Sequence, residues 1–279
     1  MINGKKVLGV TLARGGSKGI PKKNIYEING RPLIAYTIEE CLKSKFIDTY
    51  IVSTDCKEIA KVALDYGAAV PFIRPDNLAD DIATSAAALI HSLNWANQSG
   101  GNYQLVVEVM ATNPLKKAIH IDQCIELMID KGLPYCVAVR EIHDHHPARV
   151  KYLENGIMKD FFPEMIESRR QDLEPQAYVR AGSIYCMTSS ALLENEARYG
   201  KDNTAAYVLP DEYVVNIDEP KDLALAKILI QKHLNIHNKI IIGDTVKCFY
   251  PIAEISSVTM ILLVITCIAR ITCRNCGIQ

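Results

Sequence analysis

The chain has 279 residues, 49% of them hydrophobic and 23% charged, which predicts a self-sufficient core and excludes a disordered, collagen-like or fibrous protein. Its 31 basic and 32 acidic side chains give a formal net charge of −1. Because no overall positive field is present to hold a nucleic acid, no nucleic-acid partner is expected and any anion site has to be local.

The N-terminal residues and the cysteines bear on where the protein works. Lys5 and Lys6 precede an apolar run, 7–13, that resembles the core of a signal peptide, but Arg14 ends it and no small-residue cleavage pattern follows. The nine cysteines have no regular spacing, which is typical of a reducing compartment. We therefore expect the mature protein to begin at Met1, to be cytoplasmic and to have no membrane partner.

Short β-branched runs alternate with longer helical patterns, as in βαβ units around a mostly parallel sheet, and this predicts the α/β fold class. The predicted strands are 7–13, 49–53, 69–73, 104–110, 135–139, 183–187 and 213–217. The predicted helices are 32–43, 56–66, 83–98, 119–131, 189–198 and 221–233. Asp55, with Glu58 three residues later, is the expected N-cap of the second helix.

Two segments interrupt this alternation. Residues 140–181 are polar and rich in proline and histidine, and a long irregular insertion of this kind is usually a lid, a substrate loop or a subunit contact. The uncharged stretch 255–269 is shorter than the roughly 20 residues of a membrane span. We expect one domain over residues 1–234, with the insertion at about 140–181, and a C-terminal tail, 235–279, of unknown role.

The strongest local signal follows the first predicted strand: LARGGSKGIPKKN, residues 12–24. Its glycines let backbone amides approach an anion closely, and Arg14, Lys18, Lys22 and Lys23 bring the neutralising charge. Neither GxxxxGK[ST] nor GxGxxG fits, so a P-loop ATPase and an adenine-dinucleotide enzyme lose their main support. The segment predicts a polyphosphate site, and the alternative is an exposed loop with solvated lysines.

This loop is followed in order by GRPLIAYTIEE, IVSTD, RPDNLADDIATS, TNPL and NIDEPKDL. The series resembles the acylneuraminate cytidylyltransferase family, with CMP-Kdo synthetases as more distant relatives. The resemblance implies a three-layer αβα Rossmann-like nucleotidyltransferase fold, with a mostly parallel mixed sheet and a small dimerisation insertion. It also implies an enzyme that joins CTP to a sugar acid of the nonulosonate class, giving CMP-sugar and pyrophosphate, and that forms a homodimer.

The resemblance assigns roles to residues of the nucleotide site. The expected catalytic residues are Arg14, Lys18, Lys23 and Asp218. The expected nucleotide-binding residues are Arg14, Ser17, Asn24, Arg74 and Ser85. Without the resemblance, Arg74 would be interpreted as a surface residue at a strand end. Thr84 or Ser85 would be the cap of the helix that follows, and Asp218 the cap of the last helix.

Magnesium is the cofactor that the resemblance implies, with Asp218 and Asn216 as its expected ligands. Asn216 stands where the family usually has a second aspartate. An asparagine still binds Mg²⁺ through its carbonyl oxygen, but one negative charge is lost. The affinity for the metal, or the number of metals, is therefore open.

For the sugar acid, the resemblance implies contacts from Met110, Arg149, Arg170, Gln171 and Tyr185. Arg170 would clamp the sugar carboxylate with two hydrogen bonds. Met110 replaces a glutamine of the family and Lys116 replaces an arginine, so neuraminic, legionaminic and pseudaminic acids all stay open as substrates. So do a CMP-Kdo synthetase-like or other sugar nucleotidyltransferase activity, and a nucleotide-binding homologue without catalysis.

Overall fold

The computed structural model describes residues 1–17 and 19–242, with side chains up to residue 235. The chain divides into two units, Met1–His233 and Leu234–Gln279. The six-stranded sheet and its pockets belong to the first unit, and most of the predicted tail, 235–279, lies outside the described residues. No helix within the described residues has the length and hydropathy of a membrane span.

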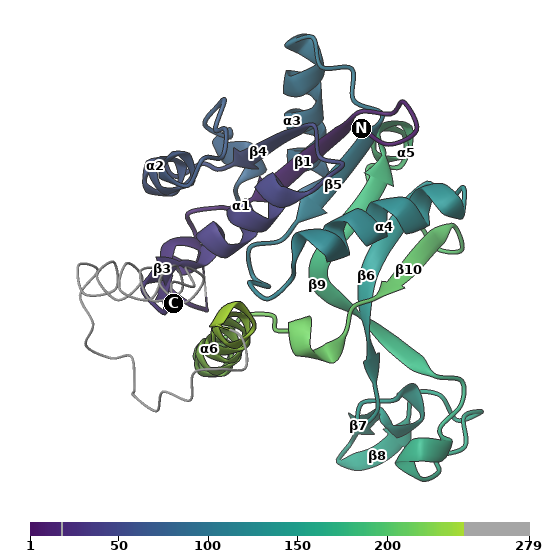
Figure 1. The fold of residues 1–279 in the computed structure, drawn as a ribbon. Coiled ribbons are helices and arrows are strands. Elements are labelled where there is room, and N and C mark those ends of the chain that lie inside the picture. The colour runs from purple at the N-terminus through teal and green to yellow at the C-terminus, as the bar shows by residue number, and fades with distance from the viewer. Residues whose placement is uncertain (18, 243–279) are drawn as a thin grey trace, which may run out of the picture. The chain divides into compact units, whose positions relative to one another are not determined.

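Six strands form one mixed sheet in the order β10-β6-β9-β5-β1-β4 (Figure 1). Their bounds are β1 Val7–Leu12, β4 Thr49–Ser53, β5 Leu105–Val109, β6 Tyr135–Ile142, β9 Ala177–Thr188 and β10 Thr204–Val208. β1 pairs in parallel with β4 and β5, and β10 pairs in parallel with β6. Only β9 runs against its neighbours in this sheet of the described residues. The predicted mostly parallel mixed sheet is therefore confirmed.

Helices cover both faces of this sheet. They are α1 Leu33–Lys43, α2 Lys57–Asp65, α3 Ser85–Gln98, α4 Ala118–Asp130, α5 Ser189–Asn195 and α6 Pro220–Ile242. Successive strand residues point to opposite faces, so Val7 and Val107 join a core cluster with α1, α2 and α4. Leu8 and Val106 join a second cluster with α3 and α5 on the other face. This arrangement is the three-layer αβα architecture that was expected.

Two predicted strands are wrong. Residues 69–73 make only single bridges, Ala69 to Ile51 and Ile73 to Thr54, because Pro71 has no N–H to continue a ladder. Residues 213–217 begin in a 3₁₀ turn, Asp211–Tyr213, and then run extended outside the sheet. The edge strand β10 was missed, since two alanines give its sequence a weak strand signal.

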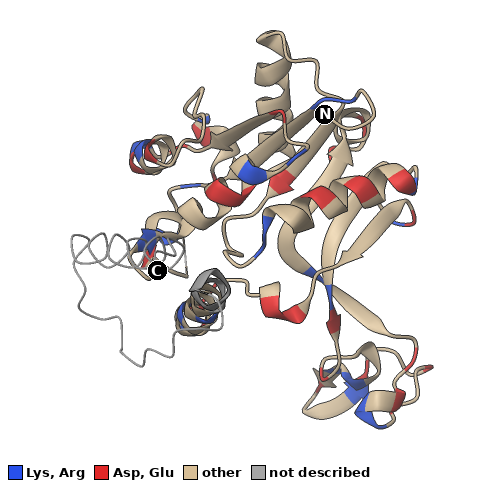
Figure 2. Cartoon of the chain, viewed as in Figure 1, with Lys and Arg blue, Asp and Glu red and all other residues tan. Residues whose placement is uncertain are grey.

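The insertion is more regular than its sequence indicated. β6 and β9 extend into it, and a hairpin of β7 Lys151–Glu154 and β8 Ile157–Asp160 lies beyond their far ends (Figure 1). Basic and acidic residues are interspersed on it, as on the rest of the described chain (Figure 2). Several apolar side chains are exposed there, and Phe161 and Phe162 are 54% and 42% exposed.

Candidate active site

The phosphate loop leaves the carboxyl end of β1, at the edge of the sheet where α/β proteins bind ligands. Its first residues are fixed to the end of β4: the Ala13 N–H donates to the Ser53 carbonyl at 3.0 Å, and the Gly15 N–H donates to Asp55 Oδ1 at 3.0 Å. Further along, Asn24 Nδ2 donates to the Arg14 carbonyl at 3.0 Å, which closes the loop on itself. These three hydrogen bonds hold the described residues of the phosphate loop, 12–17 and 19–24, in a defined conformation.

A pocket of about 310 Å³ opens beside this loop. Five residues predicted for the site line it: Arg14, Asn24, Arg74, Ser85 and Met110. They come from the loop after β1, the turn before α3, the start of α3 and the end of β5. Of the other predicted loop residues, Ser17 does not line this pocket and Lys18 lies outside the described residues.

Arg74 is a buried cation in the wall of this pocket, with 4% of its surface exposed. Its backbone N–H donates to the Thr54 carbonyl at 2.8 Å, and its Nη2 lies 3.5 Å from Asp55 Oδ1. Burial lowers the pKa of Arg74, while the Asp55 carboxylate opposes that shift. The guanidinium Nε has no hydrogen-bond partner among the described residues. Arg74 is therefore not the surface residue that its sequence position alone would indicate.

Ser85 is free of the capping role considered for it. Thr84 is the N-cap of α3, and its side-chain oxygen accepts the Ala87 N–H at 3.1 Å. Ser85 is the first residue of the helix and lines the pocket. The cap of α3 is therefore Thr84, and the Ser85 side chain is not used for capping.

Asp218 lies against the phosphate loop. Lys23 Nζ donates to Asp218 Oδ1 at 2.9 Å and to the Ile217 carbonyl at 2.8 Å. Asn216 Nδ2 donates to the other carboxylate oxygen, Oδ2. The amides of Asp218 and Glu219 are capped instead by the Asp222 carboxylate, at 2.9 and 2.8 Å, and these bonds lower the pKa of Asp222. The Asp218 carboxylate is therefore directed to the loop and not to the start of α6.

The donor set at this point suits a hard cation. The Asp218 and Asn216 side chains are in contact through the Asn216 amide nitrogen, so that amide would have to turn over to offer its oxygen to a shared cation, and the Asp218 side chain is 59% exposed. Mg²⁺ in nucleotide enzymes is usually held by one or two carboxylates together with substrate phosphates and water. No group of three or more His, Cys, Asp or Glu side chains in the described residues forms a metal cage. The chemistry thus fits a metal that arrives with a polyphosphate.

The predicted sugar-binding residues do not gather in one place within the chain. Arg170 and Gln171 line a separate pocket of about 110 Å³ in the insertion, where Arg170 Nε lies 3.6 Å from Asp144 Oδ1. Arg149 donates to the Ser168 carbonyl at 3.1 Å, also in the insertion. Only Met110 lines the pocket beside the phosphate loop.

Tyr185 is buried, with the Arg198 guanidinium 4.6 Å from the centre of its ring. Arg198 Nη1 donates to Glu108 Oε2 at 2.8 Å, and Glu108 lines the 310 Å³ pocket. Burial raises the pKa of Glu108, although Arg198 opposes the shift. This pair was not predicted from the sequence. The sequence does contain one indication of it: Glu108 is an acidic residue inside the apolar strand LVVEV, and a buried carboxylate needs a partner.

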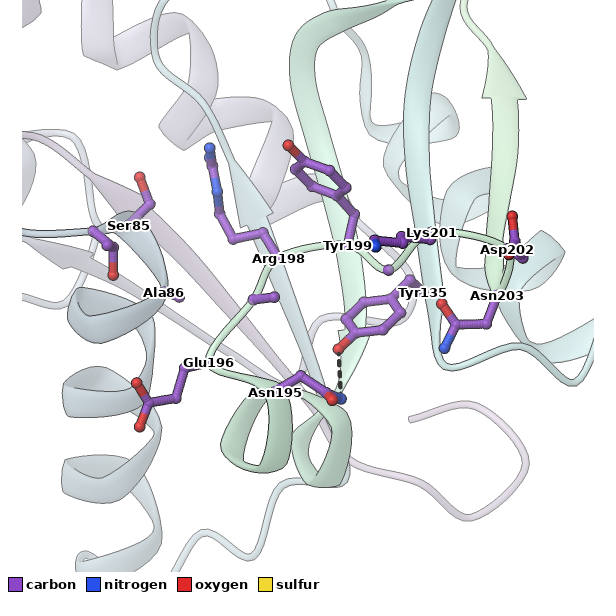
Figure 3. A pocket seen from close by; sticks show the side chains of 13 residues that line it. Ser85, Ala86, Tyr135, Asn195, Glu196, Arg198, Tyr199, Lys201, Asp202 and Asn203 are labelled. Atoms are coloured by element: carbon purple, nitrogen blue, oxygen red, sulfur yellow. Dashed lines mark hydrogen bonds between the residues drawn. The ribbon is translucent and has the colours of Figure 1, made fainter.

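A wider cavity of about 1000 Å³ adjoins the first pocket, with Thr84 and Ser85 lining both. Figure 3 shows it between the start of α3 and the loop after α5, which carries Arg198 and Tyr199. At its inner end Asn195 Nδ2 donates to the Tyr135 hydroxyl at 3.1 Å. Ser85 is the one predicted site residue that lines this cavity among the described residues.

The fold, with a glycine-rich basic loop and a pocket at the carboxyl end of β1, is that of a nucleotidyltransferase. A family model described as Cytidylyltransferase matches residues 8–234, and the chain belongs to that family of CTP-dependent nucleotidyltransferases. The predicted family resemblance and enzyme class are therefore confirmed.

Among curated proteins, the chain is similar to a pseudaminic acid cytidylyltransferase of Campylobacter jejuni, with 40% identity over 225 residues that cover 80% of this chain and 96% of the relative. It is 32% identical to a CMP-N,N'-diacetyllegionaminic acid synthase of Legionella pneumophila, over 81% of this chain and 97% of the relative. Among solved structures, a CMP:2-keto-3-deoxy-manno-octonic acid synthetase complexed with CTP has a TM-score of 0.63 at 16% identity, covering 82% of this chain and 99% of that one. This last likeness shows the fold alone.

Proposed function

We propose that the protein transfers CMP from CTP to the anomeric hydroxyl of a nonulosonic acid, and that pseudaminic acid is the substrate to test first. One observation carries the proposal: Lys23 joins the loop that lines the pocket with Arg74 to Asp218, the carboxylate proposed here as a metal ligand. Support for the sugar class comes from the pseudaminic acid cytidylyltransferase that is 40% identical over nearly its whole length.

In this reaction the sugar hydroxyl oxygen attacks the α-phosphorus of CTP, and the bond from that phosphorus to the pyrophosphate oxygen breaks. The hydroxyl proton leaves to solvent, and pyrophosphate takes the bonding electrons. The work of the protein is to align the two substrates and to neutralise the growing charge on pyrophosphate. Arg14, Lys18 and Lys23 are the cations proposed for that task, with Asn24 and Ser17 completing the loop.

Magnesium is proposed as the cofactor, held by Asp218 and the Asn216 carbonyl oxygen together with the phosphates. When bound, it would draw negative charge away from the transferring phosphoryl group. Lys23 Nζ and Asn216 Nδ2 both donate to the Asp218 carboxylate. On nucleotide binding, the Lys23 ammonium would turn from the carboxylate to a phosphate oxygen, leaving Asp218 to the metal.

The sugar site is proposed to be completed by a second copy of the chain. Arg149, Arg170 and Gln171 lie on the insertion and outside the nucleotide pocket of their own chain. The exposed Phe161 and Phe162 on the same insertion would be covered in a homodimer. Sedimentation at micromolar concentration tests this: a dimer is expected, and Phe162→Asp should shift the protein to monomer with loss of activity.

The decisive assay measures pyrophosphate release with each of the four nucleoside triphosphates and a panel of eight- and nine-carbon keto sugar acids. We expect turnover with CTP and pseudaminic acid. Turnover with Kdo alone would identify a CMP-Kdo synthetase-like enzyme instead. Tight CTP binding with no product from any acid would identify a non-catalytic homologue.

The CTP requirement and the free state of the described cysteines support a cytoplasmic location.

A further inference from the structure

Asp55 does not have the role that its sequence position predicts. The N-cap of α2 is Cys56, which makes no side-chain capping bond, so the predicted N-cap at Asp55 is wrong. The Asp55 carboxylate instead faces the phosphate loop, where its Oδ1 accepts the Gly15 N–H at 3.0 Å. The same oxygen lies 3.5 Å from Arg74 Nη2. Asp55 itself does not line the nucleotide pocket.

The contact with Gly15 sets the direction of the phosphate loop. A Cβ atom on Gly15 would lie 3.0 Å from Cys56 Cβ and 3.5 Å from Asp55 Oδ2, so the loop backbone rests directly on the turn that follows β4. Fixing the Gly15 amide fixes the peptide plane shared with Arg14. The Arg14 carbonyl in that plane accepts the hydrogen bond from Asn24, and Arg14 and Asn24 both line the pocket.

The contact with Arg74 sets the other end of the pocket. Asp55 is the only carboxylate within ion-pair distance of this guanidinium in the described residues. A buried charge without a counter-charge is strongly unfavourable, so removing Asp55 would leave Arg74 in an environment that favours its exit to solvent. Asp55 Oδ1 thus accepts a hydrogen bond from the loop and faces the Arg74 guanidinium. A displacement of the loop is therefore transmitted to Arg74, and the reverse.

We propose that Asp55 is a positioning residue that holds the phosphate loop and Arg74 in register, so that the triphosphate and the nucleoside of one ligand are gripped together. The proposal rests on the proposed function, and on a contact of Arg74 with the nucleoside of the nucleotide that the loop binds. Asp55 acts through these two groups and does not contact the nucleotide. Arg74 Nε is a buried donor in the pocket wall without a partner among the described residues, and cytosine offers an acceptor at N3 where uracil carries a proton, so the placement of Arg74 by Asp55 governs how well the protein distinguishes CTP from UTP.

Two substitutions separate the two contacts of Asp55. Asp55→Asn keeps an oxygen that accepts the Gly15 N–H and removes the charge that faces Arg74. We expect a KM for CTP raised about tenfold, a kcat changed less than about threefold and a CTP/UTP preference reduced about tenfold. Asp55→Ala removes both contacts, and kcat should then fall as well. Asp65→Asn changes an exposed carboxylate at the end of α2, the helix that follows Asp55, and is the matched control that should match the wild type.

Calorimetric binding of CTP and UTP to each variant makes the test independent of turnover. If the wild type binds CTP but forms no product, the proposed function fails while the Asp55 proposal is still judged on the two dissociation constants. An unchanged CTP/UTP ratio in Asp55→Asn would overturn the proposal. A loss of activity that is fully explained by a lowered Tm would also overturn it. Removing a carboxylate with a merely structural role would lower the amount of folded protein without altering selectivity.

Discussion

Gly19 of the phosphate loop packs directly on the backbone of Asp218. A Cβ atom built on Gly19 would lie 2.3 Å from the Asp218 carbonyl oxygen, well inside any van der Waals contact. Residues from opposite ends of the domain sequence are therefore packed backbone against backbone, beside the ion pair of Lys23 with the same aspartate. The loop and the Asp218 segment form one packed unit.

Gly19→Ala should separate that unit. The methyl group forces either the loop or the Asp218 segment to move, so kcat with CTP should fall about a hundredfold for a displacement near 1 Å, with little loss of stability because the loop is exposed. Gly16→Ala, in the same loop but with nothing within 4 Å of its added Cβ, tests the other possible cause, that an added methyl group keeps phosphates away from the backbone amides. Steady-state kinetics and thermal unfolding of both variants check this. Equal activities would show that the contact does not position Asp218.

The pair Asn216 and Asp218 predicts how metal dependence responds to charge. Asp218→Asn removes the carboxylate and should lower activity at least about a hundredfold at any magnesium concentration. Asn216→Asp adds a negative charge next to Asp218 and should lower the magnesium concentration needed for half-maximal activity. The two carboxylates repel each other without metal, so the same variant should unfold at lower temperature in EDTA. Magnesium titrations of activity and of Tm measure both effects, and an unchanged titration midpoint would contradict them.

The buried pair of Glu108 and Arg198 predicts a pH-dependent loss of stability. Arg198→Met leaves the carboxylate unpaired, at a cost of about 3 kcal/mol or more in unfolding free energy. Because the pKa of Glu108 is already raised in the folded state, the unpaired group would fold protonated, and the loss should be larger at pH 8 than at pH 5. Urea unfolding at both pH values measures it.

The control for this pair is Arg180→Met. Arg180 also lies 4.6 Å from a tyrosine ring, that of Tyr199, but it is exposed. Its loss should be small and independent of pH. Adding Glu108→Gln to Arg198→Met should restore part of the stability, as a double-mutant cycle would show. No recovery in the double variant would argue against an unpaired charge as the cause.

Those parts of the site that are contiguous in sequence could be predicted. The glycines and cations of the phosphate loop lie within one short segment, and Arg74 and Ser85 share a single motif. Glu108 and Arg198 are 90 residues apart, and neither belongs to a motif, so only the tertiary fold, which places the loop after α5 beside β5, brings them together. Asp55 shows a different limit. An aspartate before a helix satisfies the N-cap pattern whether or not its carboxylate caps.

The predicted elements were right where the hydrophobic pattern of a whole segment determines the secondary structure. They were wrong where a single residue determines it. The apolar runs of β1, β4 and β5 are buried on both faces and were recognised within one or two residues. Pro71 was enough to prevent a strand at residues 69–73. Within the insertion, β7 and β8 have no alternation of buried and exposed residues, because seven of their eight positions are exposed. The order of apolar and polar residues in the sequence could therefore not reveal these two strands.

Lys116 gives a prediction that stands apart from the chemistry. Its side chain is fully buried, and its Nζ donates to the Thr37 hydroxyl at 2.7 Å and to the carbonyls of Met110 and Asn113 at 2.7 and 2.5 Å. Burial lowers the pKa of Lys116 to about 7, against roughly 10.4 in an unfolded chain. Between these values the unfolded state holds the extra proton, so the free energy of unfolding should rise with pH through that window, by up to a few kcal/mol.

Lys116→Met removes the titrating group and should flatten this rise between pH 7 and 10. Tyrosines and cysteines that titrate in the same range are present in both proteins, so the difference between the two curves isolates Lys116. Lys61→Met, at an exposed position of α2, is the control. Denaturant unfolding at several pH values measures the curves. Parallel curves for wild type and Lys116→Met would mean that Lys116 keeps its proton throughout, shared among three acceptors that satisfy an ammonium group completely.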